Sequence, residues 1–185
     1  GAVDVKKPDA YRKWLEKAVD QLEGCDILIP ITSAGGGLGS EKYWEKAFEV
    51  DVSDRAAVEA AVKEAAESLG GLEAVVTAAG IDRCGKLADV EAAEWEKVIG
   101  VNLMGTVSVV RAALPYLKAS HGRVVTVAST LGKRAVADAT AYCASKFGVV
   151  GFSHALAAET GGEIGVTTMI PGGMKTRFFD DRTEQ

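Results

Sequence analysis

The chain has 185 residues, a formal net charge of −5 and 25% charged residues, so it is long enough for one domain with a sizeable core. It contains no block of Lys and Arg and no uninterrupted apolar run near the ~20 residues of a membrane span, so neither a nucleic-acid nor a membrane partner is expected. The cysteines number three and are scattered, which favours reduced thiols in the cytoplasm over a disulfide framework or a metal site.

The first half of the chain predicts two helices, each followed by a short strand. Apolar side chains recur at helical spacing over residues 8–22 and again over 54–69. The apolar run at 27–31 is short enough for a buried strand, although Pro30 weakens that prediction. Residues 74–78 form the next predicted strand.

The second half continues the alternation. A long helix is predicted over about 92–118, with Gly100 and Gly105 as weak points around Asn102. After it come a strand at 123–128, a helix at about 140–159 and a strand at 166–170. Helices alternating with short, fully apolar strands predict an α/β fold, a Rossmann-type parallel sheet with helices on both faces.

The N-terminal segment resembles later parts of the chain. A shift of 47 positions brings the helical stripe at 8–22 onto the stripe at 54–69 and Gly24 onto Gly71, and the triplet Trp44-Glu45-Lys46 recurs as Trp95-Glu96-Lys97. Any two units of a parallel α/β sheet share such stripes, whereas the triplet is less easily explained in this way. Coincidental likeness and an internal duplication both remain open.

The strongest chemical signal is Tyr142 and Lys146, which lie four residues apart and therefore on one face of the predicted helix. A nearby ammonium favours the phenolate and lowers a tyrosine pKa from about 10 toward neutrality. Such a phenol can exchange a proton with an alcohol or carbonyl oxygen near pH 7. A Tyr/Lys pair alone is common on helices. Ser129, which closes the strand at 123–128 and can hydrogen-bond the same oxygen, makes the catalytic interpretation the stronger one.

Small or polar residues come directly after three of the predicted strands. Ala79-Gly80 follows the strand at 74–78, Ser129-Thr130 the strand at 123–128, and Pro171-Gly172 the strand at 166–170. Ligands of open α/β sheets bind beyond the carboxyl ends of the strands. Each of these pairs could be a simple turn, but together with Tyr142 and Lys146 they predict one binding crevice.

These residues resemble the short-chain dehydrogenase/reductase family from about residue 48 to residue 179. The stretches that carry the resemblance are FEVDVSDRAAVEAAV, VTAAG, VIGVNLMG, GRVVTVAST, YCASK and MIPGGMKT. We therefore expect one Rossmann-like domain over 1–185, with an atypical segment at 1–47 and a catalytic core at 48–179. Ala78 departs from the family, which has an Asn there that braces the sheet.

The resemblance implies a role for individual residues. Tyr142 would be the proton donor or acceptor, Lys146 would lower its pKa and bind the nicotinamide ribose, Ser129 would hold the substrate oxygen, and Asn102 would anchor a water-linked proton relay. The remaining cofactor-binding residues would be Asp51 and Val52 at the adenine, Ala79 and Gly80, and Pro171, Gly172 and Thr176 beside the nicotinamide.

The glycine stretch Thr32–Gly39 fits the family's pyrophosphate loop through Gly35, Gly37 and Gly39, followed by a predicted helix at 40–47. The spacing after it is too short for the second strand of a dinucleotide fold. Three explanations stay open: the loop of a shortened fold, which we favour slightly, an echo of the turn at 77–80, or a chain from which pieces are missing. The chain also ends soon after Thr176, so the fold is expected to be incomplete at both ends.

The predicted function is an oxidoreductase that transfers hydride between NAD or NADP and a ketone or secondary alcohol. The segment that would select between the two cofactors is missing. The resemblance also implies a homodimer or homotetramer, and the apolar helices near 95–114 and 142–158 agree with this. The main alternative is a catalytically silent binding or structural subunit derived from the same family. A hydrolase using Ser129 is a weaker alternative, because no G-x-S-x-G elbow is present.

Overall fold

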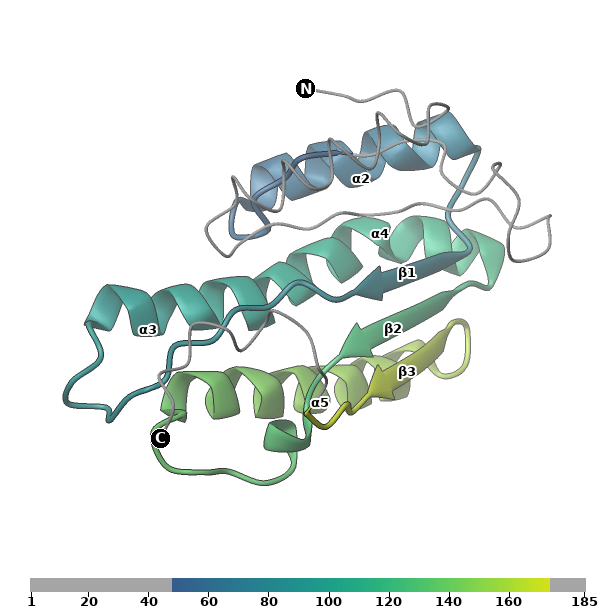
Figure 1. Cartoon of the computed structure of the whole chain (residues 1–185). Coiled ribbons are helices and arrows are strands. Elements are labelled where there is room, and N and C mark those ends of the chain that lie inside the picture. Colours follow the sequence, from purple (N-terminus) through teal and green to yellow (C-terminus); the bar gives the residue numbers. More distant parts are fainter. Residues whose placement is uncertain (1–47, 174–185) are drawn as a thin grey trace.

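The computed structural model describes residues 48–173, which form helices and strands in alternation (Figure 1). In chain order they are α2 (Arg55–Leu69), β1 (Ala74–Thr77), α3 (Ala92–Ile99), η2 (Gly100–Gly105), α4 (Thr106–Ser120), β2 (Arg123–Val127), η3 (Thr130–Gly132), α5 (Thr140–Thr160) and β3 (Gly165–Met169). Each element predicted within this range is confirmed, with ends that differ by one or two residues. The predicted elements at 8–22, 27–31 and 40–47 lie outside the described residues.

The three strands form one parallel sheet in the order β1-β2-β3. Ala74 of β1 pairs with Arg123 of β2, which in turn pairs with Gly165 of β3. Each connection is a helical crossover, as parallel strands require. The carboxyl ends of all three strands therefore lie at the same edge of the sheet, which places the segments after them close together.

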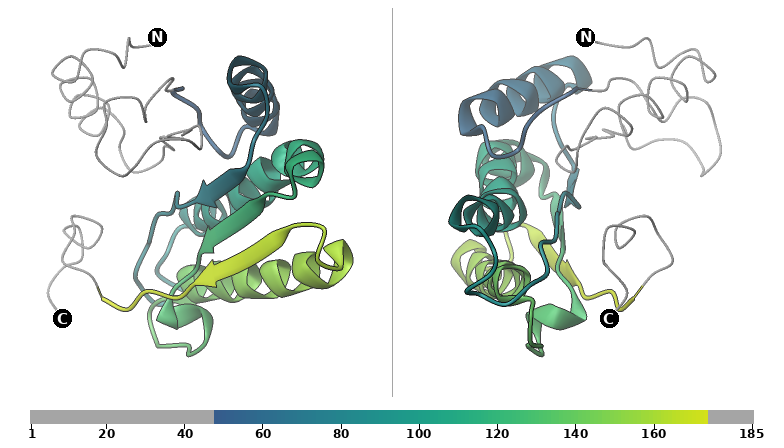
Figure 2. Two further views of the ribbon diagram at one scale, coloured as in Figure 1. Left: turned by 90° about the vertical axis from the view of Figure 1, so that its right-hand side faces the viewer. Right: turned by 60° about the vertical axis from the view of Figure 1, so that its left-hand side comes forward.

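Helices α4 and α5 cover one face of this sheet, and α2 packs beside α4 (Figure 2). The side chains of Val75, Val124 and Thr126 point to that face and are buried. Val76 and Met169 are about half exposed, at 53% and 50%. The predicted Rossmann-type α/β fold is confirmed. Within residues 48–173 the helices cover one face of the sheet, so helices on the other face remain a prediction, and the predicted helices at 8–22 and 40–47 lie outside this range.

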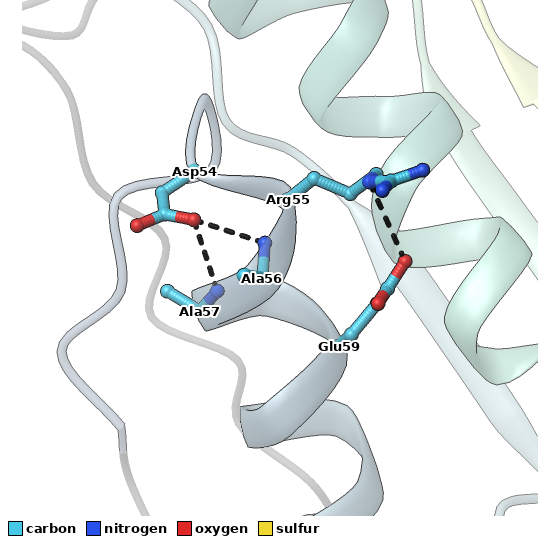
Figure 3. Close-up of polar contacts among 5 residues, drawn as sticks. All are labelled: Asp54, Arg55, Ala56, Ala57 and Glu59. Carbon is cyan, nitrogen blue, oxygen red and sulfur yellow. Dashed lines mark hydrogen bonds and ion pairs between the residues drawn. The ribbon is translucent and has the colours of Figure 1, made fainter.

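Helix α2 begins where Asp54 caps it. The Asp54 side chain accepts hydrogen bonds from the backbone N–H groups of Ala56 (2.9 Å) and Ala57 (3.1 Å), which have no partner within the helix (Figure 3). The helix ends at Gly70, whose φ of 74° lies in the left-handed region that glycine adopts without strain. The polar cap and the glycine stop thus explain both ends of this helix.

The long predicted helix changes its winding in the middle. Between α3 and α4 the six residues of η2 form a π-helical turn, bounded by the two glycines predicted as weak points, Gly100 and Gly105. A Cβ placed on Gly105 would lie 2.8 Å from Cγ2 of Val52, so the glycine allows the segment before α2 to pack directly on the helix. The irregular turn holds Asn102 in the interior.

The continuous helical run Ala92–Ser120 is long and apolar enough to cross a membrane by length and composition alone, although half of its most apolar stretch is buried inside the structure. The search for an uninterrupted apolar run does not detect this helix as a membrane span, because polar residues, including Arg111, interrupt it. Val109, Val110, Ala113 and Leu117 of α4 are fully buried in the core. We therefore interpret this run as a core helix.

Candidate functional site

The segments after β2 and β3 are joined at the carboxyl edge of the sheet. The backbone N–H of Ala128 donates to the carbonyl of Met169 (2.9 Å), and the N–H of Thr130 donates to the carbonyl of Pro171 (3.0 Å). The predicted meeting of Ser129-Thr130 with Pro171 is thereby observed in the backbone. Gly172 follows at once and is exposed.

The turn after β1 approaches the same place. A Cβ placed on Gly80 would lie 3.3 Å from Oδ1 of Asn102 and 3.4 Å from Nζ of Lys146. Such distances are tighter than most Cβ contacts, so a side chain at position 80 would press on both groups. Ala79 and Gly80 thus lie beside two of the predicted catalytic residues.

Asn102 is completely buried, and both the oxygen and the nitrogen of its amide are hydrogen-bonded within the protein. Its Oδ1 accepts the backbone N–H of Ile81 (2.7 Å), and its Nδ2 donates to the carbonyl of Ile81 (2.9 Å). The second hydrogen of Nδ2 points to Oγ of Ser145 (3.0 Å). The side chain of Asn102 therefore braces the turn after β1 against η2 and α5.

The backbone carbonyl of Asn102 also has a partner. In the π-helical turn the N–H of Thr106 donates to Leu103, and the Thr106 hydroxyl donates to the Asn102 carbonyl instead (2.9 Å). Asn102 is the residue that the family resemblance assigns to a proton relay.

Tyr142 and Lys146 lie together on α5, as their spacing predicts. The Nζ of Lys146 is 5.6 Å from the centre of the Tyr142 ring and donates to the carbonyl of Val127 at the end of β2 (2.9 Å). Tyr142 and Lys146 are 5% and 3% exposed. Burial disfavours the charged ammonium and lowers the pKa of Lys146 from 10.5 to about 8.

Ser129 opens the short turn η3. Its Oγ accepts the backbone N–H of Leu131 (3.1 Å), which leaves the hydroxyl hydrogen able to donate elsewhere. Behind it, a Cβ on Gly132 would come 2.7 Å from the backbone oxygen of Lys146, so η3 packs tightly on α5 at the lysine. Ser129 is thus held next to the strand end that binds the Lys146 ammonium.

The other predicted site residues divide into two groups. The first group, Asp51 and Val52, lies within the described residues. Asp51 is exposed, and its carboxylate accepts hydrogen bonds from the N–H (2.8 Å) and the hydroxyl (2.7 Å) of Ser53. Val52 is buried against Gly105, so only its backbone could face a ligand. The residues predicted at the pyrophosphate and beyond the last strand, Gly35, Gly37, Gly39 and Thr176, lie outside residues 48–173.

The sequence does not predict the part that two residues play in this network, Ser145 and Thr106. Ser145 lies three residues after Tyr142 and so on the same helix face, which is a usable signal. Thr106 lies four residues after Asn102, but its role depends on the π-helical turn, which periodicity does not reveal. Among residues 48–173, no group of three or more His, Cys, Asp or Glu side chains is placed to hold a metal ion.

Known proteins resemble this chain in sequence and in fold. The family model described as short chain dehydrogenase matches residues 38–185. D-threitol dehydrogenase of Mycolicibacterium smegmatis is 37% identical over 136 residues, covering 72% of this chain and 52% of the relative. Meso-2,3-butanediol dehydrogenase of Serratia marcescens is 34% identical over 133 residues, covering 71% and 53%.

Solved structures give the same result for the fold. Gluconate 5-dehydrogenase from Burkholderia cenocepacia, in complex with NADP and tartrate, superimposes with a TM-score of 0.68 at 26% identity, over 70% of this chain and 52% of that one. Ligand-free aldohexose dehydrogenase from Thermoplasma acidophilum gives a TM-score of 0.70 at 26% identity, over 77% and 56%. The chain spans about half the length of the curated relatives it matches.

Proposed function

Because this chain belongs to the short-chain dehydrogenase family, we propose that it contributes the catalytic part of a nicotinamide-dependent oxidoreductase acting on a ketone or secondary alcohol. The observation that carries the proposal is the gathering of Gly80, Asn102, Tyr142 and Lys146 at the carboxyl edge of the sheet. Within the chain, residues 48–179 would form the catalytic core.

The residues present fit a nicotinamide cofactor in two respects. Gly80 leaves open the space in front of Asn102 and Lys146 that a Cβ would fill, and Gly172 and Gly173 have no neighbouring atom within 4 Å of such a position. A backbone without side chains permits close approach of a flat, polar ligand. The relative from Burkholderia cenocepacia binds NADP, which supports NAD or NADP here without choosing between them.

When bound, the cofactor supplies or accepts the hydride at the substrate carbon, and the protein supplies geometry and a proton. In the reducing direction the Tyr142 hydroxyl donates its proton to the carbonyl oxygen, and in the oxidising direction the phenolate accepts the alcohol proton. The Ser129 hydroxyl hydrogen would orient the same oxygen. Lys146 would contact the nicotinamide ribose and favour the phenolate of Tyr142 by its charge.

The decisive experiment is a steady-state assay of the full chain with NADH and NADPH over a panel of small ketones and secondary alcohols, paired with a measurement of cofactor binding. Turnover that depends on one of the cofactors supports the proposal. A folded chain with neither turnover nor cofactor binding would favour the catalytically silent subunit instead.

We further propose a homodimer or homotetramer in the cytoplasm. Phe147 of α5 and Met104 of η2 are large apolar residues that are 45% and 52% exposed, on the two helical segments expected to associate. Cys143 is a free, buried thiol, which agrees with a reducing compartment.

A further inference from the structure

The feature that the proposed mechanism leaves unused is the hydroxyl of Ser145, which lies between Tyr142 and Lys146 in the chain. Ser145 is completely buried, as is Asn102. Its Oγ receives the hydrogen bond from Nδ2 of Asn102 (3.0 Å) and donates to the backbone carbonyl of Tyr142 (2.8 Å). One hydroxyl thus acts as acceptor and donor at the same time.

These bonds form a continuous path across three segments. It starts at Ile81 in the turn after β1, which exchanges two hydrogen bonds with the Asn102 amide of η2, and it reaches the first turn of α5 through Ser145. Every member is buried, so water does not compete for these bonds, and each bond polarises the next. Within residues 48–173, the hydrogen bond that joins the Asn102 side chain to α5 is the one to Ser145.

The first turn of α5 needs such a brace. Ala139 stands at its N-cap position and has no side chain that can cap it. The Tyr142 ring is carried by this turn, which is held by the hydrogen bond from Nε1 of Trp95 to Oγ1 of Thr140 (3.0 Å) and by the contact through Ser145 to Asn102. Ser145 fixes the backbone of Tyr142 itself.

We propose that Ser145 is a positioning residue, which aligns the Tyr142 hydroxyl for proton transfer by locking α5 to Asn102. The inference rests on the proposed function. Loss of the hydroxyl would leave one buried hydrogen of Asn102 without a partner and would free the backbone of Tyr142 to shift. Displacement of the Tyr142 hydroxyl by about 1 Å, which is much less than the length of a hydrogen bond to the substrate, would already lower the rate of proton transfer strongly, with little effect on substrate binding.

The chain offers a matched control. Ser153 lies on the same helix, is equally buried, and its Oγ donates to the carbonyl of Val149 (2.7 Å) while lying 2.8 Å from Oγ1 of Thr126. Its hydroxyl also joins α5 to a neighbouring element, but to β2 and not to Asn102. Ser145→Ala and Ser153→Ala therefore remove the same atom from similar surroundings, and similar shifts of the unfolding midpoint are expected.

The experiment compares kcat, KM and backbone hydrogen exchange at Ile81 in the wild type and in these two variants of the full chain. We expect Ser145→Ala to lower kcat by at least about tenfold with KM nearly unchanged, and to speed exchange of the Ile81 N–H. Ser153→Ala should leave both close to the wild-type values. Ser145→Cys, which keeps the shape and a weaker donor, should fall between and replaces Ser145→Ala if that variant does not fold.

The inference is overturned if Ser145→Ala matches Ser153→Ala in kcat, even where Ile81 exchanges faster, because the brace would then be structural only. It is also overturned if kcat falls equally in both variants. A wild-type chain without turnover would refute the proposed function, whereas an active wild type that is indifferent to Ser145 would refute this inference alone.

Discussion

Lys146 shows how burial changes the chemistry of one residue. Its ammonium donates a hydrogen bond to the carbonyl of Val127, and its pKa is lowered from 10.5 to about 8 because burial disfavours the charge. The native state thus binds its proton less tightly than the unfolded chain does. Folding therefore carries a penalty for the charged lysine, which is fully present below pH 8 and disappears as the pH rises from 8 to 10.5.

This penalty predicts a pH dependence of stability. Relative to Lys146→Met, which has no proton to lose, the wild type should gain roughly 3 kcal/mol in free energy of unfolding between about pH 7 and pH 11. Denaturant unfolding of both proteins across this range measures the difference when each also carries Tyr142→Phe, which removes the phenol beside Lys146, and the other titrating groups then cancel in the comparison. Lys63→Met, which replaces a side chain that is 68% exposed, should show no such trend. A flat difference for Lys146→Met would mean that the ammonium is well solvated.

The second prediction at this scale concerns the hydroxyl of Tyr142. Tyr142→Phe keeps the buried ring and so should leave folding and cofactor binding nearly unchanged. It removes the group that exchanges a proton with the substrate oxygen, and general acid–base catalysis is worth ~10²–10⁴-fold. We expect kcat to fall by at least about a hundredfold, measured in the same assay as the wild type. Equal activity of the two proteins would remove Tyr142 from the mechanism.

At the scale of elements, α2 contains one local interaction that we expect to be strong, the Asp54 cap, and one that we expect to be weak, the Arg55–Glu59 ion pair (Figure 3). Asp54→Ala removes the cap of two backbone N–H groups and should lower the free energy of unfolding by about 1 kcal/mol. Glu59→Gln removes the ion pair with Arg55, whose atoms are 3.6 Å apart on exposed side chains, and should change it by less than about 0.5 kcal/mol. Thermal or denaturant unfolding can measure both, and kcat should stay unchanged in each variant because α2 lies outside the site. Equal losses of stability would contradict this ranking.

The sequence predicts the elements well because each carries its own signal. The stripe at 54–69, the stop at Gly70 and the apolar strands need no knowledge of their neighbours. The π-helical turn is visible in the sequence only as a weakness around Asn102, since its winding depends on the packing of Gly105 against Val52. The partners of Asn102 cannot be predicted, because Ile81 and Ser145 meet it only through the tertiary fold.

At the scale of the whole molecule, the proposed association through helices can be tested by sedimentation. The wild type is expected to be a dimer or larger at micromolar concentration. Phe147→Lys puts a charge on an exposed apolar position of α5 and should shift the population toward the monomer. Val136→Lys, at another exposed apolar residue but outside α5, should leave the assembly unchanged. A monomeric wild type would contradict the proposed oligomer.

The parallel sheet also governs how quickly the chain can fold. Ala74 can pair with Arg123 only after α3, η2 and α4 have crossed between them, and β3 joins β2 only after α5 has done the same. Helices form in about a microsecond, whereas each sheet contact must wait until a long loop has closed. The entropy cost of closing the loop therefore comes before the favourable energy of strand pairing, which slows folding.

Gly122 lies at the entry to β2, where a Cβ would come 2.5 Å from the backbone oxygen of Glu73. A side chain there would obstruct the docking of β2 on β1, and the refolding rate in stopped-flow experiments should fall accordingly.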